Sequence, residues 1–243
     1  MKKTVVIMLF LLFVSGCASE PPFDPMTAFG IAEEKMQEAD YETARMGYQE
    51  IQEKSPDKSY DPVIMLRIAD TYYGEKKYSE AQVEYQAFLN YHPVNKYAPY
   101  AQNQVALCSY NEFSTIDRDP APVQNAIKEF LRLIERYPRS SYAQNAQPYI
   151  DTCKDRLAKY ELYVAKFYYK KDSYKSAVNR CENLMKTYPE SSAIEDALYY
   201  AGLSYMELGE TKNARRAFET LAKKYPHREK AAHAYLKKIS PTH

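Results

Sequence analysis

Glycine, tryptophan and net charge are all scarce in this chain of 243 residues. It has six glycines, no tryptophan and a formal charge of +1. Few glycines disfavour the tight turns of β-hairpins and favour helices. A near-zero charge without a basic stripe gives no electrostatic basis for binding nucleic acid. The sequence also lacks a nucleophile elbow, a phosphate-binding loop and the ligand spacing of a zinc site, so we expect no catalytic residues, metal or cofactor.

What the chain does contain is an internal repeat, marked by an alanine and a proline twelve residues apart. The five copies are Ala44–Pro56, Ala81–Pro93, Ala126–Pro138, Ala177–Pro189 and Ala214–Pro226. Counted from each alanine, apolar residues occupy positions +4 and +7, which lie on one face of a helix. The proline lacks an N–H and ends that helix. Each copy therefore predicts an amphipathic helix of about four turns with a fixed end.

A second helix is expected before each of these, because a small residue recurs at position −12. These residues are Ala32, Ala69, Ala165 and Gly202. In the third copy the corresponding Ala106 lies 20 positions before Ala126 instead of 12, which places an insertion of eight residues within 113–122. Helix pairs with this spacing are typical of the tetratricopeptide repeat. The sequence thus predicts an all-α fold, a right-handed superhelix of five tetratricopeptide-like helix pairs plus a C-terminal capping helix.

The expected helices divide the mature chain into an N-terminal half, residues 26–138, and a C-terminal half, residues 139–243. They span 26–38, 41–54, 62–74, 78–91, 97–112, 122–137, 141–169, 174–188, 193–208, 211–225 and 229–239. Gly74 is expected to end its helix and to supply a left-handed turn residue. The helix over 141–169 is unusually long, and Pro148 near its start predicts a kink or a break. The last helix would cover the apolar face that the final repeat leaves open.

The first 16 residues have the pattern of a secretion signal. Two lysines precede an apolar run over 5–14, which is nearer ten residues than the ~20 that a membrane-spanning helix needs. Val14-Ser15-Gly16-Cys17 resembles the lipobox of bacterial lipoproteins, in which the cysteine becomes the acylated first residue of the mature chain. Residues 17–25 would then be a lipidated cysteine and a Pro-rich tether. An ordinary signal peptide or a short membrane anchor is the alternative.

Three further cysteines, Cys108, Cys153 and Cys181, lie in the mature chain. An exported compartment permits disulfides, but an odd number leaves at least one thiol unpaired. Cys181 occupies a +4 position where the other copies carry Tyr or Phe, so we expect buried thiols that act as small hydrophobic residues. Whether any two of them pair stays open at this point.

Some residues outside the repeat positions are candidates for binding other proteins. Tyr73, Tyr97 and Tyr100 could line a groove, because tyrosine binds apolar groups with its ring and backbone with its hydroxyl. Asn179 and Arg180 should point outward, and arginine is enriched at interface hot spots. The alternatives are core tyrosines and a solvated arginine. The segment 117–120, which is expected to cap a helix start, is a third candidate, for which hydrogen bonds within its own loop are the simpler interpretation.

One group of residues resembles a known family. It comprises Lys154–Glu161, Val164-Ala165, Tyr168-Tyr169, Val178-Asn179-Arg180 and Tyr188-Pro189, with Asp117–Pro120 further upstream. Together with the order of lipobox, tether and five repeats, these residues are similar to those of the BamD family, lipoproteins of the outer-membrane β-barrel assembly machinery. The resemblance implies a non-enzymatic scaffold, held by a lipid anchor on the periplasmic side of the outer membrane.

The resemblance also implies partners for each half of the chain. The C-terminal half would dock the POTRA domains of BamA, with Arg180 and its neighbour Asn179 in the contact. The N-terminal half would recognise unfolded outer-membrane β-barrel proteins by a C-terminal signal that usually ends in an aromatic residue. Accessory lipoproteins of the machinery are further candidate partners. The repeat positions alone fit an alternative equally well, namely another periplasmic repeat-type adaptor lipoprotein that coordinates envelope or cell-wall machinery.

Overall fold

The computed structural model describes residues 23–112 and 119–239, so the predicted signal peptide, Cys17 and most of the tether lie outside the described residues. Within these ranges the chain forms twelve α-helices, two short 3-10 helices and no strand, which confirms the all-α prediction. The α-helices are α1 (Pro25–Gln37), α2 (Tyr41–Lys54), α3 (Asp61–Gly74), α4 (Tyr78–Tyr91), α5 (Ala98–Asn111), α6 (Ala121–Arg136), α7 (Ser141–Gln144), α8 (Gln147–Lys170), α9 (Tyr174–Thr187), α10 (Ile194–Glu207), α11 (Thr211–Lys224) and α12 (Glu229–Ile239). The 3-10 helices are η1 (Lys58–Tyr60) and η2 (Pro226–Arg228).

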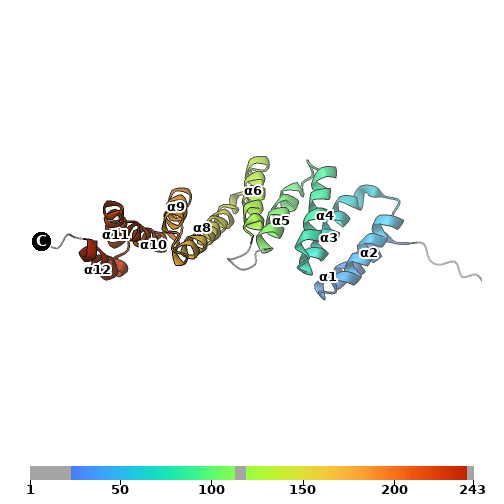
Figure 1. Cartoon of the computed structure of the whole chain (residues 1–243). Helices are drawn as coiled ribbons and strands as arrows, with labels where there is room; N and C mark the ends of the chain where they lie inside the picture. Colours follow the sequence, from blue (N-terminus) through green and yellow to red (C-terminus); the bar gives the residue numbers. More distant parts are fainter. Residues whose placement is uncertain (1–22, 113–118, 240–243) are drawn as a thin grey trace, which may run out of the picture.

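Successive helices pack against one another in chain order. Figure 1 shows an elongated stack that runs from α1 at one end to α12 at the other. In the described part of the chain, the five predicted pairs are α1 with α2, α3 with α4, α5 with α6, α8 with α9, and α10 with α11. Contacts of α2 with α3, α4 with α5, α6 with α8 and α9 with α10 join the pairs. We call the first helix of each pair its A helix and the second its B helix.

The repeat positions form the core between paired helices. The five alanines from which the repeat is counted are 0% exposed, as are Tyr85, Phe130 and Phe218 at position +4. At position +7, Ile51, Phe88, Leu133, Leu184 and Leu221 are at most 1% exposed. The alanine at −12 in the first repeat, Ala32, is also buried. The sequence periodicity therefore identified the buried face of each B helix, because side chains four and seven residues apart share a helix face.

The turn between the two helices of a pair has a left-handed residue at position −5 in four repeats. Ala39, Lys76, Asp172 and Gly209 have φ values of 59°, 61°, 56° and 72°. The expectation that Gly74 supplies such a residue is wrong, because it is the last residue of α3 and Lys76 has the positive φ. Gly74 serves a different purpose, since a Cβ at this position would overlap the ring of Tyr41.

The long helix predicted over 141–169 is interrupted near its start. A single turn, α7, ends at Gln144, and α8 begins at Gln147, so that Pro148 occupies the first turn of a new helix. Proline is tolerated there because the first N–H groups of a helix have no intrahelical partner. The remaining α8 is still 24 residues long and links the two halves of the chain through contacts with α6, α9 and α10.

The final helix, α12, closes the core of the last repeat. Its Tyr235 ring stacks on Phe218 with centroids 4.9 Å apart and planes 7° apart. The hydroxyl groups of Tyr235 and Tyr199 are 3.1 Å apart. Because Phe218 is fully buried, α12 acts as the predicted capping helix.

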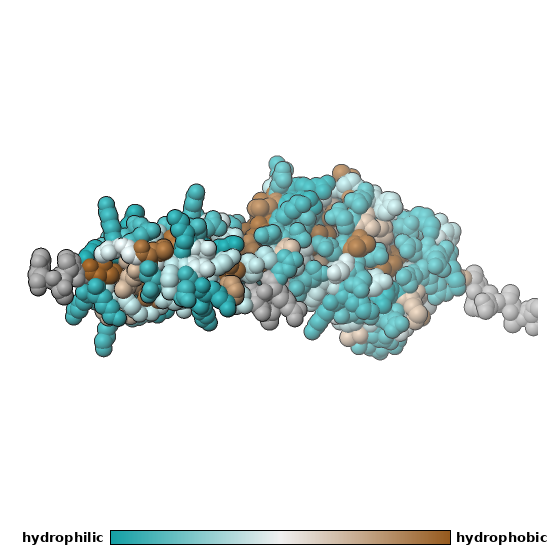
Figure 2. Space-filling view, viewed as in Figure 1, coloured by the Kyte–Doolittle hydropathy of each residue, from teal (hydrophilic) through white to brown (hydrophobic). Residues whose placement is uncertain are grey.

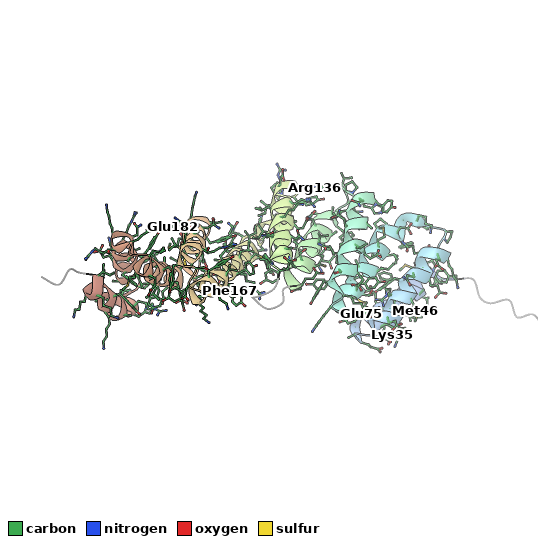
Figure 3. All side chains as sticks on the ribbon, viewed as in Figure 1. Lys35, Met46, Glu75, Arg136, Phe167 and Glu182 are labelled. Atoms are coloured by element: carbon green, nitrogen blue, oxygen red, sulfur yellow. The ribbon has the colours of Figure 1, made fainter. Side chains whose placement is uncertain are left out.

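The surface has two long edges. In Figure 3, Glu75 and Phe167, near the ends of α3 and α8, lie on the lower side of the view, and Arg136, near the end of α6, lies on the upper side. Figure 2 shows a largely hydrophilic face with small separate hydrophobic patches. Within the described residues, no helix combines the length and the apolar composition that crossing a membrane requires.

Candidate protein-binding surfaces

A pocket of about 300 Å³ lies between the A helices of the second and third repeats. One face of α3 forms one wall, the start of α5 forms the other, and α7 contributes one ring. The lining residues are Val63, Leu66, Arg67, Asp70, Tyr97, Tyr100 and Tyr142. We call it the N-terminal pocket. The four α3 residues share a face because they are spaced by three, one and three positions.

Two of the three predicted tyrosines, Tyr97 and Tyr100, are brought together in this pocket. Tyr97 is 38% exposed and stands at the rim, with the Lys96 ammonium 4.8 Å from its ring centroid. The Tyr100 ring lies deeper and tilts against Tyr142, with centroids 5.9 Å apart. The pocket therefore offers aromatic faces to a ligand, and aromatic pairs prefer such tilted arrangements.

The Tyr100 ring is held in place by a buried carboxylate. Asp70 Oδ1 accepts hydrogen bonds of 2.6 Å from the hydroxyls of both Tyr85 and Tyr100, and its Oδ2 lies 3.2 Å from Arg67 Nη1. Burial raises the pKa of Asp70 despite these three hydrogen bonds, which favour the charged form. Since Tyr85 is fully buried in α4, the pocket wall is fixed to the core of the second repeat.

An ion pair extends this network to the first repeat. Arg67 Nε lies 2.8 Å from Glu33 Oε1, and Arg67 Nη2 donates to Glu33 Oε2 at 3.2 Å. Tyr48 donates to the same carboxylate at 2.6 Å. A planar guanidinium with two contacts to one carboxylate is a geometrically specific pair. The acceptors Glu33 and Asp70 therefore connect α1, α2, α3, α4 and α5 in one hydrogen-bonded network.

Sequence reasoning missed Arg67, Asp70 and Glu33. A signal was present, because the first two repeats combine a tyrosine at +4 with an acid at −11, whereas the other three have no tyrosine at +4. In both repeats the tyrosine hydroxyl donates to that acid. The pairing explains why a core position carries a polar ring, since a buried hydroxyl needs a partner.

The third predicted tyrosine, Tyr73, lies outside the N-terminal pocket. It is near the C-terminal end of α3, where its ring meets the edge of Tyr78 at 5.4 Å. Asn111 Nδ2 donates to its hydroxyl at 2.7 Å, which ties α3 to the end of α5. Burial raises the pKa of Tyr73.

Arg180 and Asn179 occupy the surface of α9, as predicted from their place between repeat positions. Asn179 is exposed, and the Arg180 side chain is 42% exposed. Arg180 Nη1 lies 3.0 Å from Glu161 Oε2 of α8, its one ion-pair partner among the described residues, and this hydrogen bond raises the arginine pKa. A guanidinium has five N–H donors, so this pairing leaves donors that can face a partner protein.

Two other predicted features have simple structural roles. The Asp119 carboxylate accepts a 2.9 Å hydrogen bond from the Ala121 N–H two residues on, a local turn at the start of α6, whose N-cap is Pro120, while Asp117 and Arg118 lie outside the described residues. Cys108, Cys153 and Cys181 are free and buried, and burial raises the pKa of each thiol to about 12. They are therefore unreactive core residues.

Comparison with known proteins identifies the family. A family model described as "YfiO: Outer membrane lipoprotein" matches residues 22–221, which is most of the sequence. This chain belongs to the YfiO family. The "Outer membrane protein assembly factor BamD" of Vibrio cholerae is 41% identical over 100 residues, 41% of this chain and 42% of the relative. The protein of the same name from Neisseria meningitidis serogroup A is 34% identical over 113 residues, 45% of this chain and 42% of the relative.

These curated matches span about two fifths of the length of the relatives, and similarity to solved structures is weaker. The structure titled "TPR2AB-domain:pHSP90-complex of yeast Sti1" covers 88% of this chain and 84% of its own, with 12% identity and a TM-score of 0.46. The family assignment of this YfiO chain thus depends on the sequence, and the resemblance to BamD proteins is confirmed.

Proposed function

We propose that this chain is a non-enzymatic lipoprotein scaffold of outer-membrane β-barrel assembly, anchored through Cys17 on the periplasmic side of the outer membrane. The observation that supports it most is the family match over residues 22–221, together with relatives named as outer membrane assembly factors. The fold agrees with a scaffold, because stacked helix pairs present grooves and ridges that bind peptides and helical partners.

The N-terminal pocket would receive unfolded barrel proteins. Outer-membrane strands alternate apolar and polar residues and are flanked by aromatic girdles, so unfolded clients expose aromatic side chains in extended segments. Tyr97, Tyr100 and Tyr142 supply ring faces for such a side chain, and the Asp70 network fixes Tyr100 before the client arrives. A preorganised wall loses less conformational entropy on binding.

The C-terminal half would dock the POTRA domains of BamA through the surface that carries Asn179 and Arg180. The guanidinium is oriented by Glu161, so it can present its remaining donors to an acidic or carbonyl group with little loss of side-chain freedom. Accessory lipoproteins of the same machinery are further candidate partners. The N-terminal pocket lies between α3 and α5, whereas Arg180 is on α9, so client binding and BamA docking would use separate surfaces.

Depletion of this protein in its host tests the proposal. We expect a broad loss of folded β-barrels from the outer membrane, measured by heat-modifiable gel migration of several barrels. Plasmid-borne wild type should restore them, whereas a Cys17→Ala variant that remains folded should restore them poorly. Normal barrel levels with a defect in cell-wall or other envelope machinery would instead favour the alternative adaptor function.

A further inference from the structure

A second pocket, of about 350 Å³, lies between the A helices of the fourth and fifth repeats. Its lining residues are Lys159, Leu162, Tyr163 and Lys166 of α8, with Ser192, Ala193 and Asp196 at the start of α10. We call it the C-terminal pocket. Nothing in the proposed docking surface uses it, since its residues do not include Asn179 or Arg180.

The two pockets occupy equivalent places in the repeat. The α3 residues of the N-terminal pocket lie 18, 15, 14 and 11 positions before Ala81, and the α8 residues of the C-terminal pocket lie at the same four distances before Ala177. On the opposite wall, Ala193 and Asp196 are 21 and 18 positions before Ala214. Tyr97 and Tyr100 fall at these same positions when the eight-residue insertion is subtracted. Equivalent positions on A helices face the same side of a stacked repeat.

The chemistry of the C-terminal pocket suits an uncharged side chain. Leu162 and Ala193, 7% and 4% exposed, form an apolar floor, and the Tyr163 ring, 47% exposed, forms a wall. Both lysines are already paired, because Lys159 Nζ lies 2.7 Å from Asp155 and Lys166 Nζ lies 2.7 Å from Asp196. Their aliphatic stems therefore line the pocket while their charges are neutralised at the rim.

We propose that the C-terminal pocket is a second client subsite, and that one extended segment of an unfolded barrel protein crosses both pockets, placing an apolar or aromatic side chain in each. This inference rests on the proposed client recognition by the N-terminal pocket. The equivalence of repeat positions is what places both pockets along one path, and the neutral lining of the second pocket selects the same kind of side chain as the first.

The spacing of the pockets sets the spacing of the two side chains. The two pockets are two repeats apart along the A helices, and since packed helices lie ~8–10 Å apart, we take about 20 Å as the smaller value of their separation. Tyr142 and Tyr163, one in each pocket, are 21 residues apart along α7 and α8, and at the helical rise this corresponds to about 31 Å, which we take as the larger value. An extended client covers this range with about six to nine residues. Because alternate side chains of a strand face opposite ways, the separation should be even, six or eight, which fits within one outer-membrane strand of about 9–11 residues.

Synthetic peptides test this inference directly. Four fluorescent peptides share one polar host sequence and carry two phenylalanines six, seven or eight residues apart, or one phenylalanine. Anisotropy measures their affinity for wild-type protein, for Tyr163→Ala, and for the matched control Phe167→Ala, which removes another exposed ring from α8 that does not line the pocket. Circular dichroism checks that both variants are folded, and BamA co-purification with each variant is recorded in parallel.

We expect wild type to bind one of the two peptides with an even spacing at least about tenfold more tightly than the seven-residue and single-phenylalanine peptides, since the second side chain binds intramolecularly. Tyr163→Ala should remove this advantage and leave the affinity for the single-phenylalanine peptide unchanged, while Phe167→Ala changes neither. If Tyr163→Ala does not fold, the comparison of the four peptides on wild-type protein still decides the question.

Three results would overturn the second subsite. They are equal affinity of wild type for all four peptides, an equal loss of affinity for all four in Tyr163→Ala, and unchanged peptide affinity with reduced BamA co-purification in that variant. The last would assign the pocket to BamA docking. Failure of wild type to bind any of the peptides would contradict client recognition by the N-terminal pocket as well, and so would be distinguished from failure of the second subsite alone.

Discussion

The left-handed residue at position −5 allows a quantitative test of whether equivalent turns in different repeats have the same backbone conformation. Lys76 has a φ of 61° and an exposed side chain, whereas the equivalent Gly209 has a φ of 72°. Of the four turns of this kind in the described residues, three carry a side chain at this position and only the one at Gly209 does not. Exchange of the two residue types should therefore change stability in opposite directions.

The magnitude follows from the backbone. A left-handed conformation costs a residue with a Cβ about 1–2 kcal/mol. A glycine avoids this cost, but part of the gain is offset because the greater conformational freedom of glycine in the unfolded chain favours unfolding by about 0.4–1 kcal/mol. Lys76→Gly should then stabilise the protein by about 0.5–1 kcal/mol, and Gly209→Ala should destabilise it by a similar amount. A Cβ at Gly209 meets no atom within 4 Å, so its cost is a backbone cost alone.

Thermal unfolding followed by circular dichroism measures both variants, with Lys76→Ala as the control that removes the lysine but keeps a Cβ. A change of 1 kcal/mol shifts Tm by about 2–4 °C for a chain of this size, so Lys76→Gly should raise Tm by about 1–4 °C and Gly209→Ala should lower it equally. Lys76→Ala should change the free energy of unfolding by less than about 0.5 kcal/mol. A Lys76→Gly variant as unstable as Gly209→Ala would refute the reasoning.

Three further predictions concern the surface and the core. Arg180→Gln should weaken BamA binding, while Glu161→Gln should leave most of that binding intact. Both variants should change the free energy of unfolding by no more than ~1 kcal/mol. A loss of stability as large as that of a core substitution would mean that the ion pair has a structural role instead. Burial opposes ionisation, but hydrogen bonds from Lys159, Ser191 and Ser192 lower the pKa of Asp155 to about 2. Its ionised form thus stabilises the fold above the unfolded pKa near 4, and this contribution is lost as pH falls toward 2. Acid titration of Asp155→Asn should show a smaller loss over that window, and an unchanged profile would argue against this role. In Gly202→Ala the new Cβ would lie 2.7 Å from the buried Phe218 ring, whereas in Gly30→Ala it would meet no atom within 4 Å. Gly202→Ala should therefore be about 1–3 kcal/mol less stable than Gly30→Ala. Equal urea midpoints of the two variants would contradict this packing.

The repeat could be predicted from the sequence because it requires side chains of a particular size at fixed positions. Ala177 and Leu184 must be small and large for two helices to pack at a fixed distance, and this constraint recurs in every copy. The pattern therefore located the helix pairs and their buried faces. It also indicated a break near Pro148, although it could not show whether α8 would bend or begin anew there.

Only part of the N-terminal pocket could be predicted, because the polar residues that hold its tyrosines come from different helices. Tyr97 and Tyr100 stood out as aromatic residues outside the repeat positions, but Arg67 and Asp70 acquire their role only when α3 meets α1, α4 and α5. Tyr73 is equally conspicuous in sequence, yet its hydroxyl is directed to Asn111. The role of Gly74 was wrongly predicted for a similar reason. Local turn preferences suggested a left-handed residue at this position, whereas the residue is a glycine because a side chain there would overlap Tyr41.

The most direct test of the proposed function is purification of the full-length lipidated protein from its native outer membrane, with a benzoylphenylalanine photo-crosslinker at Asn179. We expect BamA to co-purify and to form the main crosslink from this position. A crosslinker at Val83, an exposed residue of α4, serves as the control and should not reach BamA. Folded, membrane-anchored protein that captures no BamA at either position would contradict the assignment of this chain to the assembly machinery.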